Sequence, residues 1–362
     1  MADESQIYGN LQAHLDKLPI GFPSTRSGVE IRILKHLLTP AEAELACQLS
    51  MIPEPLDQIY DRPDRSKIAI DELERALDRM VEKGSIDGRE KANHKLYSLI
   101  LFMAGMYELQ VDRLTEDFAR DARLYLDGEY GDEMYRTKIP QLRTIPVRQS
   151  VATPEKFSVS SYDDIRSIIE NVDGQIAVVN CICRQASNAI GESCTKTDLL
   201  ETCIAFRWYA DRFLRWGIGR SITKDEALAI LDKAQEAGLV LQPLNSQRPL
   251  AVCCCCGDCC GILRTVKRFP RPAELYATNY YAEIDPELCT GCEICVPRCQ
   301  LDAITIVNDV AVVDLDRCIG CGNCVASCDF DAAQLRKKET EMVPPKGTGD
   351  LYMKIMAKKA SK

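Results

Sequence analysis

The sequence predicts an α+β protein made of several domains, and three observations lead to this class. Segments with helical periodicity and segments with strand periodicity follow one another along 362 residues, which is enough chain for two or three domains. Eighteen of the 19 cysteines lie between Cys181 and Cys328, and a basic tail follows them. We therefore expect a first domain at 1–150, a cysteine-rich domain at 151–279, a third domain at 280–336 and a tail at 337–362.

The overall charge and hydropathy exclude several classes of protein. Because 54 Asp and Glu residues outnumber 45 Lys and Arg residues, the net charge is −9, whereas binding to nucleic-acid phosphates requires a basic surface. No segment has the ~20 uninterrupted apolar residues of a membrane helix, and the N-terminus lacks the features of a signal peptide. We therefore expect a cytoplasmic protein without a transmembrane segment, and nucleic acid is not favoured as a partner.

The first domain is expected to contain three main helices and then a β-hairpin. The helical segments are 28–38, 40–50 and 68–84. Thr39 followed by Pro40 is typical of a helix N-cap, and Gly84 is typical of a helix C-cap. Residues 85–100 read as two short strands around a polar turn. This order of elements is typical of a winged-helix domain.

A winged helix can bind DNA, so that function is one alternative for this domain. Residues 28–100 contain 11 basic and 14 acidic residues and have a net charge of −3. The third helix mixes both signs, and it would repel a phosphate backbone about as strongly as it would attract one. We therefore expect the domain to dock a partner protein or a second copy of the chain.

The cysteine-rich domain is expected to be an α/β fold. Its elements are a helix at 161–172, a strand at 175–180, a helix followed by a strand at 221–243, and a strand at 249–252. The strand at 175–180 leads directly into Cys181 and Cys183, and the last strand runs into the sequence CCCCGDCCG. Cys194 and Cys203 are expected in the loop and helix between these strands.

The third domain contains one cysteine motif in two copies. The spacing Cys-x2-Cys-x2-Cys-x3-Cys begins at Cys289 and recurs 29 residues later at Cys318. In such a run the first three cysteines bind three irons of a [4Fe–4S] cubane, and the fourth reaches the cluster of the other copy. The expected ligand sets are Cys289, Cys292 and Cys295 with Cys328, and Cys318, Cys321 and Cys324 with Cys299. Zinc is the alternative, but the third cysteine at x2 spacing fits iron–sulfur ligation better.

Residues 280–336 resemble the bacterial two-cluster ferredoxins. This resemblance implies a ferredoxin-like fold. The two copies of the motif themselves imply a repeated unit of strand, cysteine loop, helix and strand, with strands at 303–307 and 310–315. The sequence departs from that family after the fourth cysteine of each run, where Gln300 and Asp329 replace the usual proline. We expect this departure to change the reduction potentials but not the ligation.

The cysteines of the middle domain are candidate ligands for at least one further iron–sulfur cluster. They are Cys181, Cys183, Cys194, Cys203, Cys253, Cys254, Cys255, Cys256, Cys259 and Cys260. The first four can saturate one cubane, and the later run can supply a further set. Arg184 is placed to offset the negative charge of a cluster. Buried free thiols together with a zinc site are the alternative, because cysteine is also a common core residue.

Strand geometry would divide the CCCCGDCC run between two faces. Alternation directs Cys253 and Cys255 to one face of a strand, and it directs Cys254 and Cys256 to the other. Cys256 and Cys259 have the spacing of a C-x2-C chelate. No histidine can assist these thiols from nearby in the sequence, because all three histidines lie in the first third of the chain.

Nearly the whole chain is also similar to a group of anaerobic bacterial and archaeal proteins described as 4Fe–4S dicluster-domain proteins. The similarity runs from GFPSTRSGVEIRILKHLLTPAEAE through NCICRQ and CCCCGDCCGILRTVKR to the cysteine repeat. It implies a role in anaerobic redox metabolism.

We interpret the sequence as a multi-cluster iron–sulfur protein that passes electrons between redox partner proteins. No GxGxxG fingerprint or P-loop predicts a nucleotide or flavin site, so donor and acceptor are expected to be proteins. One alternative is a redox-sensing winged-helix transcription regulator. Another is a reductase that binds its substrate at an open iron of the middle cluster, although no histidine near the cysteines could donate a proton. An electron carrier or oxidoreductase subunit is therefore favoured over a stand-alone enzyme.

Two remaining features are interpreted as structural. Cys47 lies on a predicted helix and is expected to pack in a core. The residues after Leu335 include 8 basic and 3 acidic side chains, a net charge of +5, and we expect a solvated extension. Docking of this tail to an acidic partner or a membrane surface is the alternative.

Overall fold

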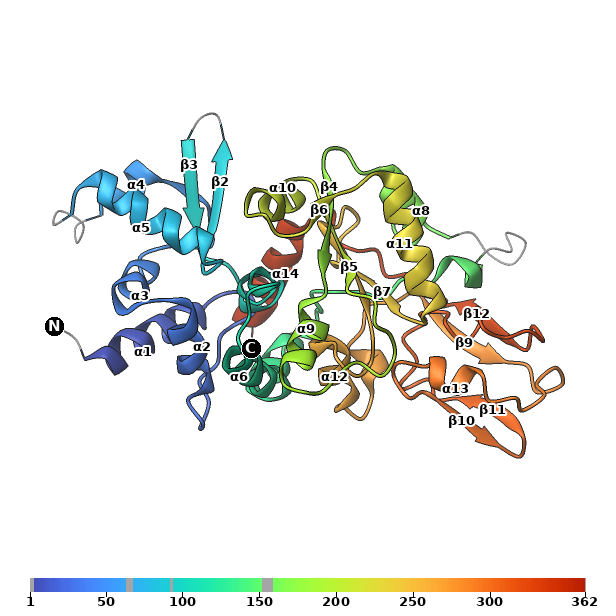
Figure 1. Cartoon of the computed structure of the whole chain (residues 1–362). Helices are drawn as coiled ribbons and strands as arrows, with labels where there is room; N and C mark the ends of the chain where they lie inside the picture. Colours follow the sequence, from blue (N-terminus) through green and yellow to red (C-terminus); the bar gives the residue numbers. More distant parts are fainter. Residues whose placement is uncertain (1–2, 63–67, 92–93, 152–158, 362) are drawn as a thin grey trace. The chain divides into compact units, whose positions relative to one another are not determined.

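The computed structural model describes residues 3–62, 68–91, 94–151 and 159–361 (Figure 1). The chain divides into two compact units, Met1–Glu133 and Met134–Lys362. Within the described ranges, each helix is too short or too polar to span a lipid bilayer.

The first unit combines helices with a small antiparallel sheet. Its first helices are α1 (Glu4–Leu15), α2 (Val29–Leu37), α3 (Pro40–Ala46), α4 (Leu56–Tyr60) and α5 (Ile70–Glu82). The sheet has the order β1-β3-β2 and consists of β1 (Glu54–Pro55), β2 (Asp87–Lys91) and β3 (His94–Ser98). Helices and a hairpin therefore occur where the periodicity predicts them, although α3 ends several residues early, with Cys47 as its C-cap.

Local contacts at the helix ends fix where α3 begins and where α5 ends. The Thr39 hydroxyl accepts a hydrogen bond from the Glu42 amide, and the Glu42 carboxylate accepts one from the Thr39 amide at 2.8 Å. The same carboxylate forms an ion pair of 2.7 Å with Lys83 at the end of α5. Gly84 then turns the chain with φ +71°, and a Cβ there would lie 2.5 Å from the Leu109 side chain.

Aromatic side chains fill the core beyond the hairpin. This part contains kinked turns at Phe102–Met106 and Glu108–Gln110, and helices α6 (Glu116–Asp127) and α7 (Glu129–Tyr135). The ring of Phe22 contacts those of Phe102 and Tyr125 edge to face, at centroid distances of 5.7 and 4.9 Å. Such contacts stabilise the unit beyond the burial of apolar area.

The second unit is built on a five-stranded sheet of order β6-β4-β5-β8-β7. Its strands are β4 (Ile176–Asn180), β5 (Glu201–Phe206), β6 (Arg220–Ser221), β7 (Val240–Pro243) and β8 (Ala251–Cys255). All of these pairings are antiparallel, so the predicted α/β arrangement is wrong in this respect. An α/β fold usually has parallel strands, but the alternation of helical and extended segments along the sequence does not encode strand direction. Cys203 is also on strand β5, and not in the expected loop and helix.

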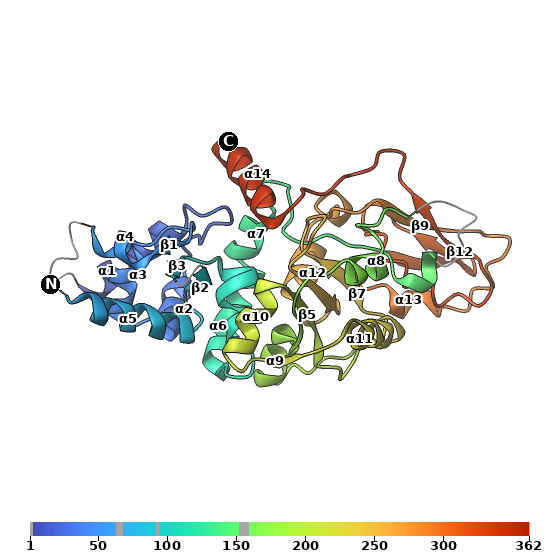
Figure 2. The same cartoon turned by 90° about the horizontal axis from the view of Figure 1, so that it is seen from above.

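Helices cover both faces of this sheet. They are α8 (Ile165–Glu170), α9 (Ile182–Ala189), α10 (Trp208–Arg215), α11 (Lys224–Glu236) and α12 (Gly261–Lys267). Helices α8 and α11 lie together on one face (Figure 2), where Ile169 and Leu231 join a core with Ile204, Val252 and Cys254. The opposite face of β5 and β8 therefore points away from this apolar core.

Two antiparallel strand pairs follow, and they are built from the two copies of the cysteine motif and its flanking strands. Strand β9 (Tyr280–Ile284) pairs with β12 (Ala333–Lys337), and β10 (Ile304–Val307) pairs with β11 (Val310–Val313). Helix α13 (Cys295–Arg298) lies inside the first cysteine run. Displacement by 29 residues relates β10 to β12, and it also relates the left-handed residues Asp302 and Asp331, with φ of 54° and 53°.

The basic tail is not the solvated extension that its composition suggested. It forms helix α14 (Thr348–Ala360), in which Leu351 and Ile355 are completely buried. The i, i+4 spacing of these two residues gives the helix one apolar edge among its lysines. Before the helix, the Gln247 amide donates to the carbonyl of Pro345 at 2.8 Å, which fixes the approach of the chain.

Candidate metal centres

The two cysteine runs of residues 289–328 interleave around two separate pockets. The first pocket is lined by Cys289, Cys292, Cys295 and Cys328. The second is lined by Cys318, Cys321, Cys324 and Cys299. The last cysteine of each run thus crosses to the pocket of the other run, which is the grouping that the sequence spacing predicts.

Backbone amides donate to the sulfurs that line these pockets. The contacts are Ala311 N to Cys289 Sγ at 3.4 Å, Ala282 N to Cys318 Sγ at 3.4 Å, Ala303 N to Cys299 Sγ at 3.2 Å, and Ala333 N to Cys328 Sγ at 3.5 Å. Donors of this kind favour the anionic form of sulfur and tune the potential of a bound cluster. Both pockets are therefore suited to thiolates that bind a metal.

Left-handed glycines let the chain pass close to each pocket. Gly291 and Gly320 are equivalent in the two runs and have φ of +67° and +64°. A Cβ at these positions would lie 2.4 and 2.2 Å from a backbone oxygen of a neighbouring segment. Glu293 and Gly322 form a second equivalent pair with positive φ. The two loops therefore follow the same path, and only glycine fits at the first pair of positions.

Four of the eight pocket thiols are poorly suited to remain free thiolates. Burial raises the pKa of Cys321 to about 12, and it also raises the pKa of Cys324. Burial raises the pKa of Cys295 and Cys299 as well. A bound cation compensates for this effect, because it stabilises the deprotonated form directly.

Six cysteines of the middle segment form a second concentration of sulfur, which we call the six-thiol group. Each member contacts the next, in the order Cys203, Cys253, Cys255, Cys260, Cys183, Cys181. Cys203 and Cys253 lie directly opposite each other on β5 and β8. Contacts with neighbouring thiols, together with burial, raise the pKa of Cys181, Cys253 and Cys255.

The ends of two helices bring the rest of the six-thiol group to this face of the sheet. Cys181 is the N-cap of α9, and Cys183 lies in its first turn. Cys260 is the N-cap of α12, and its sulfur lies 3.9 Å from the Gln242 amide nitrogen. Helix N-termini carry partial positive charge, so they favour thiolate ligands or an anionic cluster.

Arg184 is buried between the sulfurs, with only 1% of its surface exposed. Its guanidinium lies 3.6 Å from the Cys256 sulfur and donates to the carbonyl of Cys254 and to the hydroxyl of Thr202. Burial alone would lower the pKa of Arg184, but the charges of Cys181 and Cys256 raise it. That Arg184 offsets the negative charge of a bound cluster stays a prediction.

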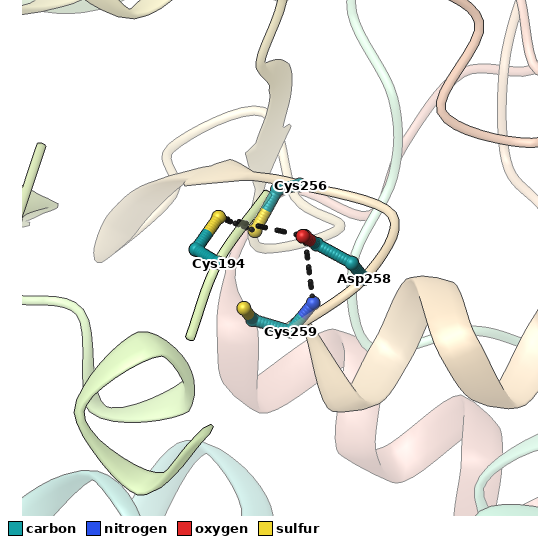
Figure 3. Close-up of side chains that lie close together, drawn as sticks. All are labelled: Cys194, Cys256, Asp258 and Cys259. Carbon is teal, nitrogen blue, oxygen red and sulfur yellow. Dashed lines mark hydrogen bonds between the residues drawn. The ribbon is translucent and has the colours of Figure 1, made fainter. Parts of the chain in front are cut away.

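Three more cysteine sulfurs lie close to the carboxylate of Asp258, and we call these four residues the compact group. Its members are Cys194, Cys256, Asp258 and Cys259, with all donor atoms within 4.8 Å of one another (Figure 3). The Cys194 and Cys256 sulfurs are 3.7 Å apart, and Cys194 Sγ lies 3.5 Å from Asp258 Oδ1. A hydrogen bond from Cys259 lowers the pKa of Cys256 to about 6, although burial opposes the shift.

The structure therefore divides the predicted middle ligands differently from the sequence. Cys194 was expected to join Cys181, Cys183 and Cys203, but it lies with Cys256 and Cys259. Asp258 was not among the predicted ligands; its position inside the C-x2-C chelate was the available signal.

Cys254 was a predicted ligand, but it packs in the apolar core with 1% of its surface exposed and, unlike Cys256 and Cys259 of the same core, it does not belong to the compact group. The reason is the alternation of side chains along β8. Cys47 lies in the first unit, and burial raises its pKa.

Residues 281–329 match the family model of the 4Fe–4S dicluster domain. This match and the interleaved cysteine pockets define an iron–sulfur protein with a ferredoxin-type dicluster domain near its C-terminus. Among curated proteins and solved structures, none matches the chain.

Proposed function

We propose that the protein transfers electrons between redox partner proteins of anaerobic metabolism. Two [4Fe–4S] clusters would be bound by the ligand sets of the two pockets, and a further cluster by the six-thiol group. The observation that carries the proposal is the crossing of Cys299 and Cys328 between the pockets. We further propose a cytoplasmic location, because the cytosol keeps so many thiols reduced and available to iron.

The surface around the first pocket favours it as the site where electrons enter or leave. Cys292 is exposed, and the apolar side chains of Ile294 and Phe330 at the same pocket are 44% and 48% exposed. An apolar rim with a cluster close behind it suits a transient redox partner. Cys324 of the second pocket is buried, so the second cluster would relay electrons inward.

Chemistry and position support a further cluster at the six-thiol group. Six thiols exceed the four that a cubane needs, and two helix N-termini and Arg184 offset negative charge there. Next to Cys299 of the second pocket, Gln300 accepts a hydrogen bond from the Gly257 amide at 2.7 Å. Gly257 lies between Cys255 and Cys260, so this bond joins the two cysteine regions.

For the first unit we propose a winged-helix-like domain that docks a partner protein or a second copy of the chain. The element order and the sheet order β1-β3-β2 support this interpretation. DNA binding is disfavoured, because Lys95 of the hairpin is already paired with Glu74 and Asp78 of α5, at 2.9 and 2.7 Å.

Iron and acid-labile sulfide in the full-length protein, purified without oxygen, test this proposal. We expect more than the roughly eight iron atoms that two cubanes contain. Cys292→Ala and Cys321→Ala should each lose about four irons and one cluster signal in low-temperature electron paramagnetic resonance spectra of the reduced protein. Cys47→Ala is the control and should keep its full iron content. Retention of all iron by either variant would show that the ligand assignment is wrong.

A further inference from the structure

We infer that the compact group of Cys194, Cys256, Asp258 and Cys259 binds a single zinc ion. This centre is distinct from the iron–sulfur clusters of the proposed function, and its existence does not depend on electron transfer. Three thiolates and one carboxylate complete four-coordinate ligation without any group from outside the chain.

Two distances within the compact group match those of a tetrahedron around one ion. With Zn–S bonds of ~2.3 Å and a Zn–O bond of ~2.0 Å, tetrahedral angles place two sulfurs about 3.8 Å apart and a sulfur and an oxygen about 3.5 Å apart. The corresponding distances are 3.7 Å from Cys194 Sγ to Cys256 Sγ and 3.5 Å from Cys194 Sγ to Asp258 Oδ1. The four side chains lie close together (Figure 3), and all of their donor atoms are within 4.8 Å of one another.

The same measure separates this centre from the two clusters proposed for the dicluster domain. A cubane binds each thiolate to a different iron, so its four sulfurs must stand farther apart than those around one ion. The eight cysteines of the dicluster domain surround two pockets instead. In the ranges that the structure describes, the compact group alone brings three or more Cys, His, Asp or Glu donors within 4.8 Å of one another.

Hydrogen bonds hold the carboxylate in place for ligation. Oδ2 of Asp258 accepts from the backbone amide and the hydroxyl of Thr195, at 2.7 and 3.0 Å. Oδ1 accepts from the Cys259 amide at 2.9 Å and faces the sulfurs. Outer contacts of this type orient a ligand and are a regular part of zinc sites.

The ion would tie two distant segments together. Cys194 lies in the segment after α9, whereas the other three ligands form the turn between β8 and α12. The same turn contains Gly257, which bonds to Gln300 of the dicluster domain, and it precedes Cys260 of the six-thiol group. A zinc ion here would therefore be structural, because it would cross-link the segment after α9 to this turn.

Metal analysis of the full-length protein tests this inference. Zinc, iron and sulfide are measured together in the wild type, in Cys194→Ser and in Cys47→Ser. We expect about one zinc per chain in the wild type and in Cys47→Ser, at least a tenfold loss of zinc in Cys194→Ser, and unchanged iron and sulfide in all three. Loss of iron and sulfide, with zinc retained, in Cys194→Ser would overturn the assignment.

X-ray absorption at the zinc edge of the wild type covers the case in which Cys194→Ser fails to fold. We expect three sulfur neighbours at ~2.3 Å and one oxygen at ~2.0 Å. A wild-type protein that holds iron and sulfide but no zinc would overturn this site and leave the electron-transfer proposal intact. That proposal fails on a different result, namely full iron retention in Cys292→Ala or Cys321→Ala.

Discussion

At the scale of single residues, Gln300 departs from the ferredoxin pattern, and its side chain links the dicluster domain to the rest of the second unit. The bacterial two-cluster ferredoxins usually have proline here, and a proline could make neither side-chain bond of Gln300. The side chain is buried; it accepts from the Gly257 amide at 2.7 Å and donates to the carbonyl of Gly238 at 2.9 Å. Gly257 itself must be glycine, since a Cβ would lie 2.3 Å from the carbonyl oxygen of Gln300. The substitution thus attaches the dicluster domain to the cysteine-rich turn.

Gln300→Pro should weaken this attachment without removing a cluster. It leaves the buried Gly257 amide without its acceptor, which costs about 1–3 kcal/mol of stability. We expect faster hydrogen exchange in residues 254–260, measured by mass spectrometry, and unchanged iron content. Asp329→Pro is the matched control, because Asp329 occupies the equivalent position but is exposed. Equal exchange in both variants would refute the role assigned to Gln300.

At the scale of elements, strand β8 directs three consecutive cysteines to two different faces. Cys254 faces the core that α8 and α11 cover, together with Val252. Cys253 and Cys255 face the other way, toward Cys203 and Cys260. One strand thereby supplies both an apolar core and a sulfur-rich surface, because successive side chains point to opposite faces of a sheet.

This sorting predicts opposite results for two adjacent substitutions. Cys255→Ala should lower iron and sulfide, because it removes a member of the six-thiol group. Cys254→Ala should keep both and should lower the free energy of unfolding by roughly 1–2 kcal/mol, because it opens a small cavity in the core. Metal analysis and urea unfolding of the two full-length variants make the comparison. If both variants retain the iron of the wild type, the six-thiol group holds no cluster.

Some elements and ligand groups could be predicted from the sequence, and others could not. Periodicity located α2, α5 and the strands beside the cysteines, because a local pattern decides an amphipathic element. The repeat of 29 residues also specified which cysteines share a pocket, since the crossing of Cys299 and Cys328 follows from spacing. The partner of Cys194 could not be predicted in this way. Its approach to Cys256 depends on the antiparallel order of β5 and β8, which sequence pattern does not encode.

At the scale of the whole molecule, the charge of the chain favours the proposed electron transfer over the alternative function of a DNA-binding regulator. The chain has a net charge of −9, and residues 28–100 have a net charge of −3. Helix α5 is the element that would enter a DNA groove in a winged helix. Its Glu74 and Asp78 bind Lys95 of the hairpin, so these groups neutralise one another and do not form a basic surface. A phosphate backbone would therefore gain little from contact with this unit.

We accordingly expect no sequence-specific binding of the full-length protein to duplex DNA from the region upstream of its own gene. Affinity for duplex DNA comes largely from counterions that Lys and Arg side chains displace, and it falls steeply with salt when many phosphates are contacted. Fluorescence anisotropy at ~50 and ~150 mM salt should show neither saturable binding nor a steep salt dependence. The measurement needs both oxidised and reduced protein, because a redox-sensing regulator would bind in one state only. Saturable nanomolar binding in either state, competed by the same unlabelled duplex but not by a scrambled one, would contradict this prediction and favour the regulator.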